Sequence, residues 1–219
     1  MEFRPLSENP EADWWISQVL PWLKEAGDPY YSWFFGGVGR TDRPEPTLAA
    51  WMQRRSSEVA VARAVLLVTG DRALGGFIAL GGSELQVCRR ADTLAALQAA
   101  GRDRRSILAE RIRQSQELFP PVAEDEFYLS KLWVAGGSRR AGHGARILRE
   151  YLGTGMGQGF RRFRLDVWAQ NLPAVELYLT SGFDVLRECR SDQAGMSYLH
   201  MGLELAEVDD GGVDPGPAR

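Results

Sequence analysis

The sequence predicts an α/β fold, because two kinds of apolar pattern alternate along the chain. Short apolar runs rich in β-branched residues are typical of strands, and segments with apolar residues at helical spacing lie between them. Hydrophobic residues make up 44% and charged residues 25% of the 219 residues, which is an ordinary globular composition. No stretch recurs with a period of roughly 20–50 residues, which argues against a repeat array. We therefore expect a single domain over residues 1–205.

The N-terminal quarter predicts one short strand and two helices. Residues 3–6 are the candidate strand. Apolar spacing predicts a helix over residues 12–24, which Pro21 is expected to end or kink because proline lacks an amide donor. A second short helix is expected over residues 46–55, with Pro46 in the favourable first turn.

A hairpin and a helical insertion follow. Two apolar runs joined by a turn at Gly70-Asp71 predict a pair of antiparallel strands, over residues 59–68 and 74–80. We interpret residues 83–125 as a helical insertion between the third and fourth strands. Its helices are expected over residues 92–100 and 106–119.

The last third of the chain predicts four strands and two more helical segments. The strands are expected over residues 128–134, 163–169, 183–187 and 196–205. The first helix of this part should end near Leu152, because glycines follow at positions 153, 155, 157 and 159. Residues 206–219 are rich in Gly, Pro and Asp and predict a disordered acidic tail.

Charge and composition argue against several classes of protein. The formal net charge is −3 and the tail alone carries −3, so the remainder is balanced, which argues against a nucleic-acid binder. No apolar run approaches ~20 residues, so no membrane span is expected, and the N-terminus has no apolar signal core. Cys88 and Cys189 are far apart and predict reduced thiols in a cytoplasmic protein. Nothing in the sequence indicates a metal.

The turn at residues 139–145 predicts an anion site. It lies between an extended run and a helical one, where main-chain N–H groups and the helix dipole favour a negative charge. Gly142 and Gly144 leave room for a phosphate to approach the backbone, and Arg139 and Arg140 add positive charge. A tight connection without a ligand is the alternative. The Rossmann and P-loop signatures are both incomplete here.

Downstream residues extend this pattern. Asn171, Ala174, Tyr178 and Gly182-Phe183 follow a strand at residues 163–169. In order and spacing, residues 127–190 resemble the GNAT superfamily of acyl-CoA-dependent N-acetyltransferases. The resemblance implies a mixed, strongly twisted sheet with helices on both faces, and acetyl-CoA as acyl donor. Its pyrophosphate would lie on Arg139, Arg140, Ala141, Gly142, His143, Gly144 and Ala145.

The same resemblance implies roles near the thioester. Two neighbouring strands would splay apart, so that the backbone of residues 132–134 (Leu132, Trp133 and Val134) pairs with the pantetheine arm. The Val134 N–H would stabilise the oxyanion. Tyr178 is the candidate acid for the departing thiolate, since a tyrosine pKa of about 10 exceeds that of a thiol, roughly 8.5. Packing on the sheet is the alternative for Tyr178. Asn171 and Ala174 would contact the cofactor, although Asn171 also fits a helix N-cap.

The general base and the acceptor site are less well defined by the sequence. Glu126 and Ser130 are the candidates for deprotonating the amine, with a solvated loop as the alternative for the acidic residues 124–126. Eight aromatic residues fall between positions 14 and 35, and we expect Tyr31 and Trp33 to line the acceptor pocket. Arginines at residues 102–113 predict a solvated helix face or a dock for an anionic group.

The resulting expectation is a cytoplasmic enzyme, monomeric or homodimeric, that acetylates the amine of a small molecule. Acetylation of a protein or peptide amine and a non-catalytic acyl-CoA sensor are the alternatives.

Overall fold

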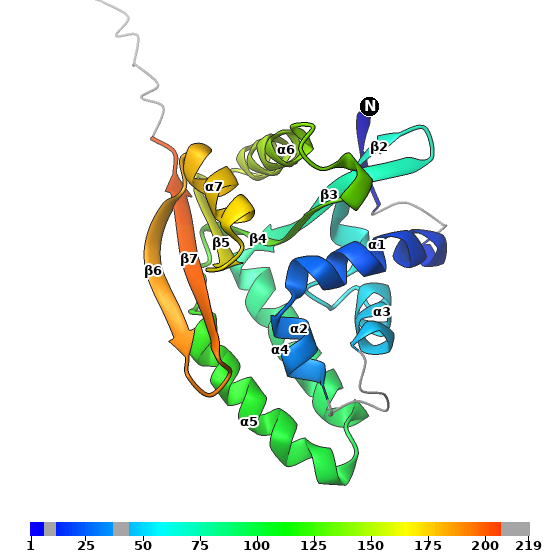
Figure 1. Cartoon of the computed structure of the whole chain (residues 1–219), viewed down its shortest axis with the longest axis vertical. Helices are drawn as coiled ribbons and strands as arrows, with labels where there is room; N and C mark the ends of the chain where they lie inside the picture. Colours follow the sequence, from blue (N-terminus) through cyan, green and yellow to red (C-terminus); the bar gives the residue numbers. More distant parts are fainter. Residues whose placement is uncertain (7–11, 37–43, 207–219) are drawn as a thin grey trace, which may run out of the picture.

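A seven-stranded sheet runs through the molecule, with helices on both faces (Figure 1). The computed structural model describes residues 1–6, 12–36 and 44–206. The strand order is β1-β2-β3-β4-β5-β7-β6, and neighbouring strands are antiparallel except for the parallel pair β4 and β5. The strands are β1 Glu2–Pro5, β2 Ala64–Thr69, β3 Arg72–Gly81, β4 Glu126–Val134, β5 Arg162–Trp168, β6 Asp184–Ser191 and β7 Met196–Glu204.

Two apolar cores hold the helices against the sheet. One lies between β2–β4 and helices α1 to α5, and the other between the opposite face and helices α6 and α7. The helices are α1 Ala12–Gly27, α2 Tyr30–Phe35, α3 Glu45–Gln53, α4 Gly82–Ala99, α5 Arg102–Leu118, α6 His143–Gly157 and α7 Leu172–Thr180, with 3-10 turns η1 Val61–Arg63 and η2 Gly136–Ser138. The predicted mixed α/β sheet is confirmed, with α4 and α5 lying between the third and fourth strands.

Helix α1 continues past Pro21 to Gly27, so of the two expected effects of this proline, the end of the helix is wrong. Pro21 is exposed, and Ser17, four residues earlier, is exposed as well. The carbonyl that loses its helical donor therefore faces water. The buried side of the helix, including Val19 and Leu23, is fully packed and holds the helix together.

Helix α6 continues to Gly157, five residues beyond the predicted end. Gly155 faces the sheet, where a Cβ atom would lie 2.5 Å from Cε1 of Phe163 and 2.6 Å from Cδ1 of Phe127. Glycine therefore permits close packing of this helix on β4 and β5, and that packing outweighs its low helix propensity.

Two further boundaries differ from the sequence prediction. Strand β2 begins at Ala64, because Val59 and Val61 are buried in a turn and in η1 rather than in a strand. Helix α4 begins at Gly82, ten residues earlier than expected. Most side chains in its first half are polar, which hides the helix from an apolar pattern. The predicted tail lies outside the described residues, apart from Ala206.

Strands β4 and β5 separate halfway along β4. They pair over residues 126–129 and 162–165, and the rest of β4 has no partner on that side within the described sheet. On the other side of β4, Ile78 pairs with Lys131 and Ala79 with Leu129, which leaves Ser130 as the extra residue of a β-bulge. The bulge reverses which face each following side chain takes. The splayed strands expected from the family resemblance are therefore present.

No helix within the described ranges is long and apolar enough to cross a membrane.

Candidate active site

The turn between β4 and α6 ends in free main-chain amides. Gly142 is the N-cap of α6 and has a φ of 77°, a left-handed conformation that glycine adopts readily. Its carbonyl accepts the amide of Arg146, which starts the helical hydrogen-bond ladder. The amides of His143, Gly144 and Ala145 precede that ladder and are available to an anion.

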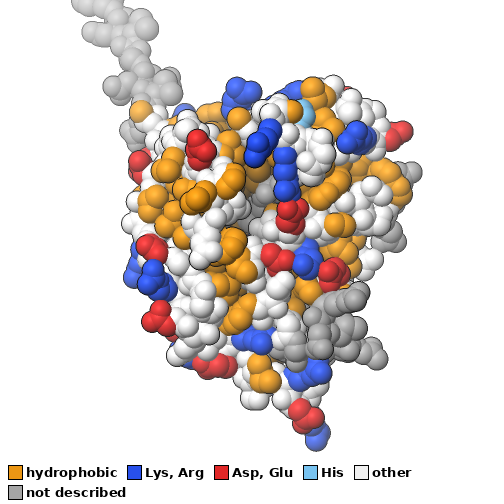
Figure 2. Space-filling model, viewed as in Figure 1, with side chains coloured by type: hydrophobic (Ala, Val, Ile, Leu, Met, Phe, Trp, Pro, Cys, Tyr) orange, Lys and Arg blue, Asp and Glu red, His pale blue; other side chains and the backbone are white. Residues whose placement is uncertain are grey.

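Arginine side chains surround this turn. Nη2 of Arg139 lies 2.7 Å from Oε1 of Glu25 in α1, and its Nε donates to the carbonyl of Val134 at 3.3 Å. Arg140 is exposed and has a φ of 61°. Figure 2 shows basic side chains gathered around α6 at the top of the view. The turn therefore adds side-chain charge to its main-chain amides.

Gly144 lies in a narrow gap between α6, α7 and the end of β4. A Cβ atom there would lie 3.2 Å from Cδ2 of Leu177 and 3.9 Å from Cγ2 of Val134. Any side chain at this position would fill the space directly beside the free amides.

The open edge of β4 leads to the same turn. The amide of Ala135 donates to the carbonyl of Leu74 in β3 at 2.8 Å. Because main-chain groups alternate along a strand, those of Val134 and Leu132 face away from β3, toward the gap between β4 and β5. Those of Trp133 face β3 and are used within the sheet.

Helix α7 brings two of the predicted residues to this region. Tyr178 is buried beside Phe183 and has no hydrogen-bond partner among the described residues, and burial raises the pKa of its hydroxyl. Asn171 is the N-cap of α7, where Oδ1 accepts the amide of Ala174 at 3.4 Å. The capping alternative for Asn171 is therefore present in the structure.

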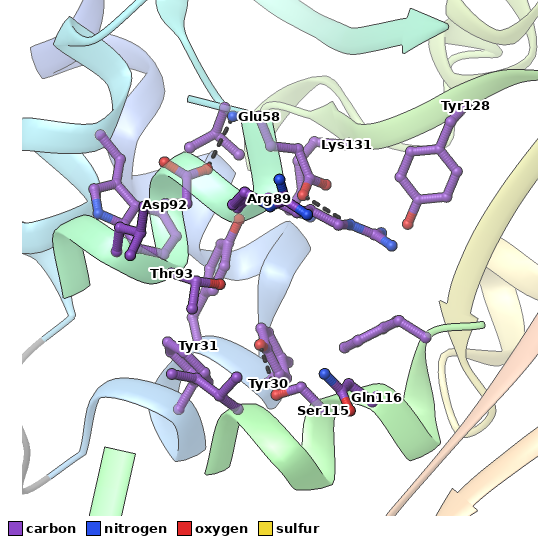
Figure 3. A pocket seen from close by; sticks show the side chains of 17 residues that line it. Tyr30, Tyr31, Glu58, Arg89, Asp92, Thr93, Ser115, Gln116, Tyr128 and Lys131 are labelled. Carbon is purple, nitrogen blue, oxygen red and sulfur yellow. Dashed lines mark hydrogen bonds and ion pairs between the residues drawn. The ribbon is translucent and has the colours of Figure 1, made fainter. Parts of the chain in front are cut away.

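A cavity of about 430 Å³ lies on the face covered by α1 to α5 (Figure 3). One side of it carries charged groups and the other is largely aromatic. It is lined by Tyr30, Tyr31, Phe34, Trp51, Glu58, Val59, Arg89, Arg90, Asp92, Thr93, Leu94, Ile112, Ser115, Gln116, Phe119, Tyr128 and Lys131.

Glu58 is the carboxylate that faces the bulge of β4. Ser130 Oγ donates to its Oε1 at 2.7 Å, Arg89 Nε donates to its Oε2 at 3.2 Å, and its own amide donates to Asp92 at 2.9 Å. Burial alone would raise the pKa of Glu58, but Arg89 and Lys131 outweigh burial and hold this pKa below its ordinary value. Glu58 is therefore ionised at neutral pH.

Lys131 connects the bulge to the aromatic side of the cavity. Its Nζ donates to the carbonyl of Ser130 at 2.8 Å and lies 5.2 Å from the ring centroid of Tyr31, and burial lowers its pKa. Tyr31 thus lines the cavity, and its role toward an acceptor stays a prediction. Trp33 does not line it, and its ring packs 5.7 Å from the guanidinium carbon of Arg111.

Asp92 supports the loop that carries Glu58. It pairs with Arg54, accepts a hydrogen bond from Ser57 Oγ at 3.1 Å, and binds the Glu58 amide. Burial raises the pKa of Asp92 to about 6.

The structure does not bring Glu126 to this cavity. Glu126 lies at the paired end of β4, 4% exposed, with Oε1 3.0 Å from Arg162 and 2.8 Å from Arg164. Its other oxygen accepts the amide of Ala123 at 2.8 Å. Both carboxylate oxygens are thus engaged in holding the strand ends together.

Two further titratable side chains, Glu84 and His200, have partners as well. Glu84 pairs with Arg63. His200 is buried on β7 with Nδ1 2.8 Å from Asp166, and Tyr128 donates its hydroxyl to the other oxygen of Asp166 at 2.8 Å. His143 begins α6, at the turn.

The arginines of residues 102–113 include structural contacts. Arg111 donates to the carbonyl of Phe34 at 3.2 Å and to that of Gly36, which holds the end of α2. Arg113 is exposed and pairs with Glu110. Neither of these two arginines lines the cavity.

Sequence analysis missed Glu58, Arg89 and Asp92. Glu58 lies in a turn after α3 and is 72 positions from Ser130, so no local spacing connects the two residues. Arg89 and Asp92 lie on α4, in the part of the insertion where no functional residue was expected. Among the described residues, no group of three or more His, Cys, Asp or Glu side chains could hold a metal ion.

Comparisons with known proteins agree with this fold. An N-acetyltransferase from Staphylococcus aureus Mu50 has a TM-score of 0.57 at 15% identity, over 85% of this chain and 96% of that one. A ribosomal-protein-alanine N-acetyltransferase from Brucella melitensis has a TM-score of 0.54 at 13% identity, over 94% and 100%. A NatC complex bound to Gag peptide and CoA has a TM-score of 0.51 at 10% identity, over 94% and 98%. At these identities the likeness concerns the fold alone, which is that of acetyltransferases.

Part of the sequence also matches a family model. Residues 106–183 match the family model described as Acetyltransferase (GNAT) family. This segment is therefore similar to GNAT acetyltransferases, and the predicted resemblance to that family is confirmed. No protein of curated function matches the sequence.

Proposed function

We propose that this protein transfers the acetyl group of acetyl-CoA to the amine of a small-molecule acceptor. One observation carries the proposal. Strand β4 leaves β5 at Ser130, so the same strand offers an open edge that leads to the α6 turn and side chains that line a cavity.

The turn and the open edge fit acetyl-CoA. Residues 139–145 offer the unpaired amides of residues 143–145, a helix N-terminus and two arginines to the diphosphate, and Gly144 leaves the space beside them clear. Leu132 and Val134 would hydrogen-bond the pantetheine arm through the main chain, with Asn171 and Ala174 at the start of α7 beside it. Bound acetyl-CoA supplies an acetyl group activated as a thioester.

Glu58 would accept the proton of the acceptor amine, which must be neutral to attack. Its carboxylate is ionised, lines the cavity and is connected to β4 by the 2.7 Å hydrogen bond from Ser130. Ser130 would then orient the carboxylate or pass the proton. Glu126 has no comparable access.

Tyr178 would donate a proton to the departing thiolate. Its raised pKa keeps the hydroxyl protonated, and this hydroxyl has no competing partner among the described residues. The amide of Val134 would stabilise the negative charge that develops on the carbonyl oxygen.

The cavity favours a small acceptor. Its volume of about 430 Å³ lies under α2, α4 and α5, which suits a compact molecule with an apolar body. A protein or peptide amine is the alternative, because two structural neighbours are a ribosomal-protein-alanine N-acetyltransferase and a complex bound to a peptide.

Calorimetric binding of acetyl-CoA, combined with free-thiol release against panels of small amines and peptides, tests the proposal. We expect binding and thiol release that depends on a small amine. Release with peptides alone would favour the alternative acceptor, and binding without release across both panels would favour an acyl-CoA sensor. The absence of binding would contradict the proposal.

A further inference from the structure

The cavity is lined by more cationic than anionic side chains, which does not suit an acceptor whose only charge is an ammonium group. Three cationic side chains line it, Arg89, Arg90 and Lys131, against the carboxylates of Glu58 and Asp92. Asp92 is already paired outside the cavity with Arg54. Asp166 also attracts Arg89 and Lys131 but does not line the cavity, because its oxygens bind Tyr128 and His200. Glu58 is therefore the one lining carboxylate without such a partner outside the cavity, and three cations line the same space, so an acceptor with only an ammonium group would enter a region of excess positive charge.

Arg89 has hydrogen-bonding capacity that the protein does not use. Its Nε binds Glu58, while neither terminal nitrogen has a hydrogen-bond partner among the described residues. The guanidinium carbon lies 5.0 Å from the ring centroid of Tyr128 and 5.9 Å from that of Phe119. Figure 3 shows the side chain reaching past Glu58 toward Tyr128. The two rings fix the guanidinium, and its terminal donors lie at the cavity.

We infer that the acceptor is an amine that also carries an anionic oxygen group, a carboxylate or a phosphate, and that Arg89 binds this group. This inference rests on the proposed function. A forked guanidinium matches the paired oxygens of such groups, and donors left unpaired in a partly buried site are costly. Arg90, exposed on the same helix and also lining the cavity, adds a second positive charge.

The geometry gives the two ends of the acceptor separate places. The amine would lie at Glu58 and Ser130, next to the open edge of β4. The anionic group would lie at the terminal nitrogens of Arg89. The rings of Tyr30, Tyr31 and Phe34 line the space across from these charged groups and would cover the apolar body of the acceptor (Figure 3).

Matched ligands test the inference. With CoA present, calorimetry would compare the product analogues N-acetylphenylalanine, its neutral amide, and 2-acetamidoethylphosphonate. We expect at least one of the two acids to bind about tenfold more tightly than the amide, and the stronger acid identifies the anionic group. Equal binding of acid and amide, or no binding of any of the three, would overturn the inference.

Arg89→Lys keeps the positive charge but removes the fork. We expect this variant to lose most of the preference for the acid over the amide while its acetyl-CoA affinity is unchanged. Arg190→Lys is the matched control, because Arg190 also pairs with a carboxylate, Glu188, but on the distant strand β6. A preference that survives in Arg89→Lys would overturn the assignment to Arg89. If acetyl-CoA itself fails to bind the wild type, the proposed function fails instead, and the two failures are thus distinguishable.

Discussion

The α6 turn and the cavity are built in different ways, although both depend on β4. The turn uses main-chain groups of consecutive residues, 139–145, held by the packing of a helix on the sheet. The cavity uses side chains from a loop, from α4 and from β4 that are distant in the sequence. A binding site made of main chain is sensitive to added bulk, whereas one made of side chains is sensitive to the loss of single functional groups. Substitutions can therefore test the α6 turn and the cavity independently.

The largest effect is expected from Glu58→Gln in the cavity. Loss of the base should lower kcat by about 10²–10³-fold, while acetyl-CoA affinity stays the same. Glu188→Gln is the matched control, because Glu188 likewise accepts a hydrogen bond from a serine, Ser197, at 2.6 Å and pairs with an arginine. Steady-state kinetics with the best acceptor measures both variants. A kcat of Glu58→Gln close to that of the wild type would show that Glu58 is not the general base.

On the donor side, Gly144→Val is expected to weaken acetyl-CoA binding by at least about tenfold, because the new side chain fills the gap beside Leu177. Gly153→Val in the same helix is the control, since a Cβ there meets nothing within 4 Å. Calorimetry gives the dissociation constants and thermal unfolding gives the stability of each variant. Equal affinities for the two variants would show that the turn does not hold the cofactor.

Tyr178→Phe tests the connection between the two regions. We expect kcat to fall about tenfold with little change in stability, because the hydroxyl has no hydrogen-bond partner among the described residues. Tyr151→Phe provides the contrast, since its hydroxyl donates to the carbonyl of Phe127 at 2.6 Å. That change should cost about 1 kcal/mol of stability and leave kcat unchanged. An unchanged kcat together with a lower stability of Tyr178→Phe would make Tyr178 a packing residue.

The pH dependence of stability tests Asp92, which supports the loop that carries Glu58. Asp92 has a pKa of about 6 in the folded state, above the 3.8 expected when unfolded. Because the folded state holds the Asp92 proton more tightly, this group stabilises the fold fully below the unfolded pKa of 3.8. That stability is lost as the pH rises through the folded pKa of about 6. Lowering the pH from 7 to 5 should therefore favour the wild type over Asp92→Asn by roughly 1 kcal/mol. Denaturant unfolding at both pH values measures this difference. The same change in the free energy of unfolding for the wild type and for Asp92→Asn between the two pH values would contradict the prediction.

The smallest effect is expected from Glu25→Gln. This change releases Arg139 from its exposed ion pair and should strengthen acetyl-CoA binding by about two- to threefold at low salt. The gain should decline as ionic strength rises. A weaker affinity would mean that Glu25 positions Arg139 for the cofactor instead of competing with it.

The same contrast explains what the sequence could predict. The α6 turn, Asn171 and Tyr178 follow each other along one strand–helix–strand–helix segment, so local spacing places them. Glu58 reaches Ser130 only through the folding of the chain, and a glutamate in a turn carries no distinguishing pattern. The ends of α1 and α6 were misjudged for a related reason. Pro21 and Gly155 have unfavourable local propensities, and tertiary packing outweighs them.

The bulge at Ser130 has a consequence for how this protein can change over time. The proposed donor contacts on β4 are backbone groups at residues 132 and 134, which no side-chain substitution removes. The proposed acceptor site instead uses side chains of the same strand: Tyr128 and Lys131 line the cavity, and Ser130 binds Glu58. Mutational drift at these three positions can therefore explore new acceptors while the acetyl source is retained. A combinatorial library there offers a route to altered substrate range that leaves the donor chemistry in place.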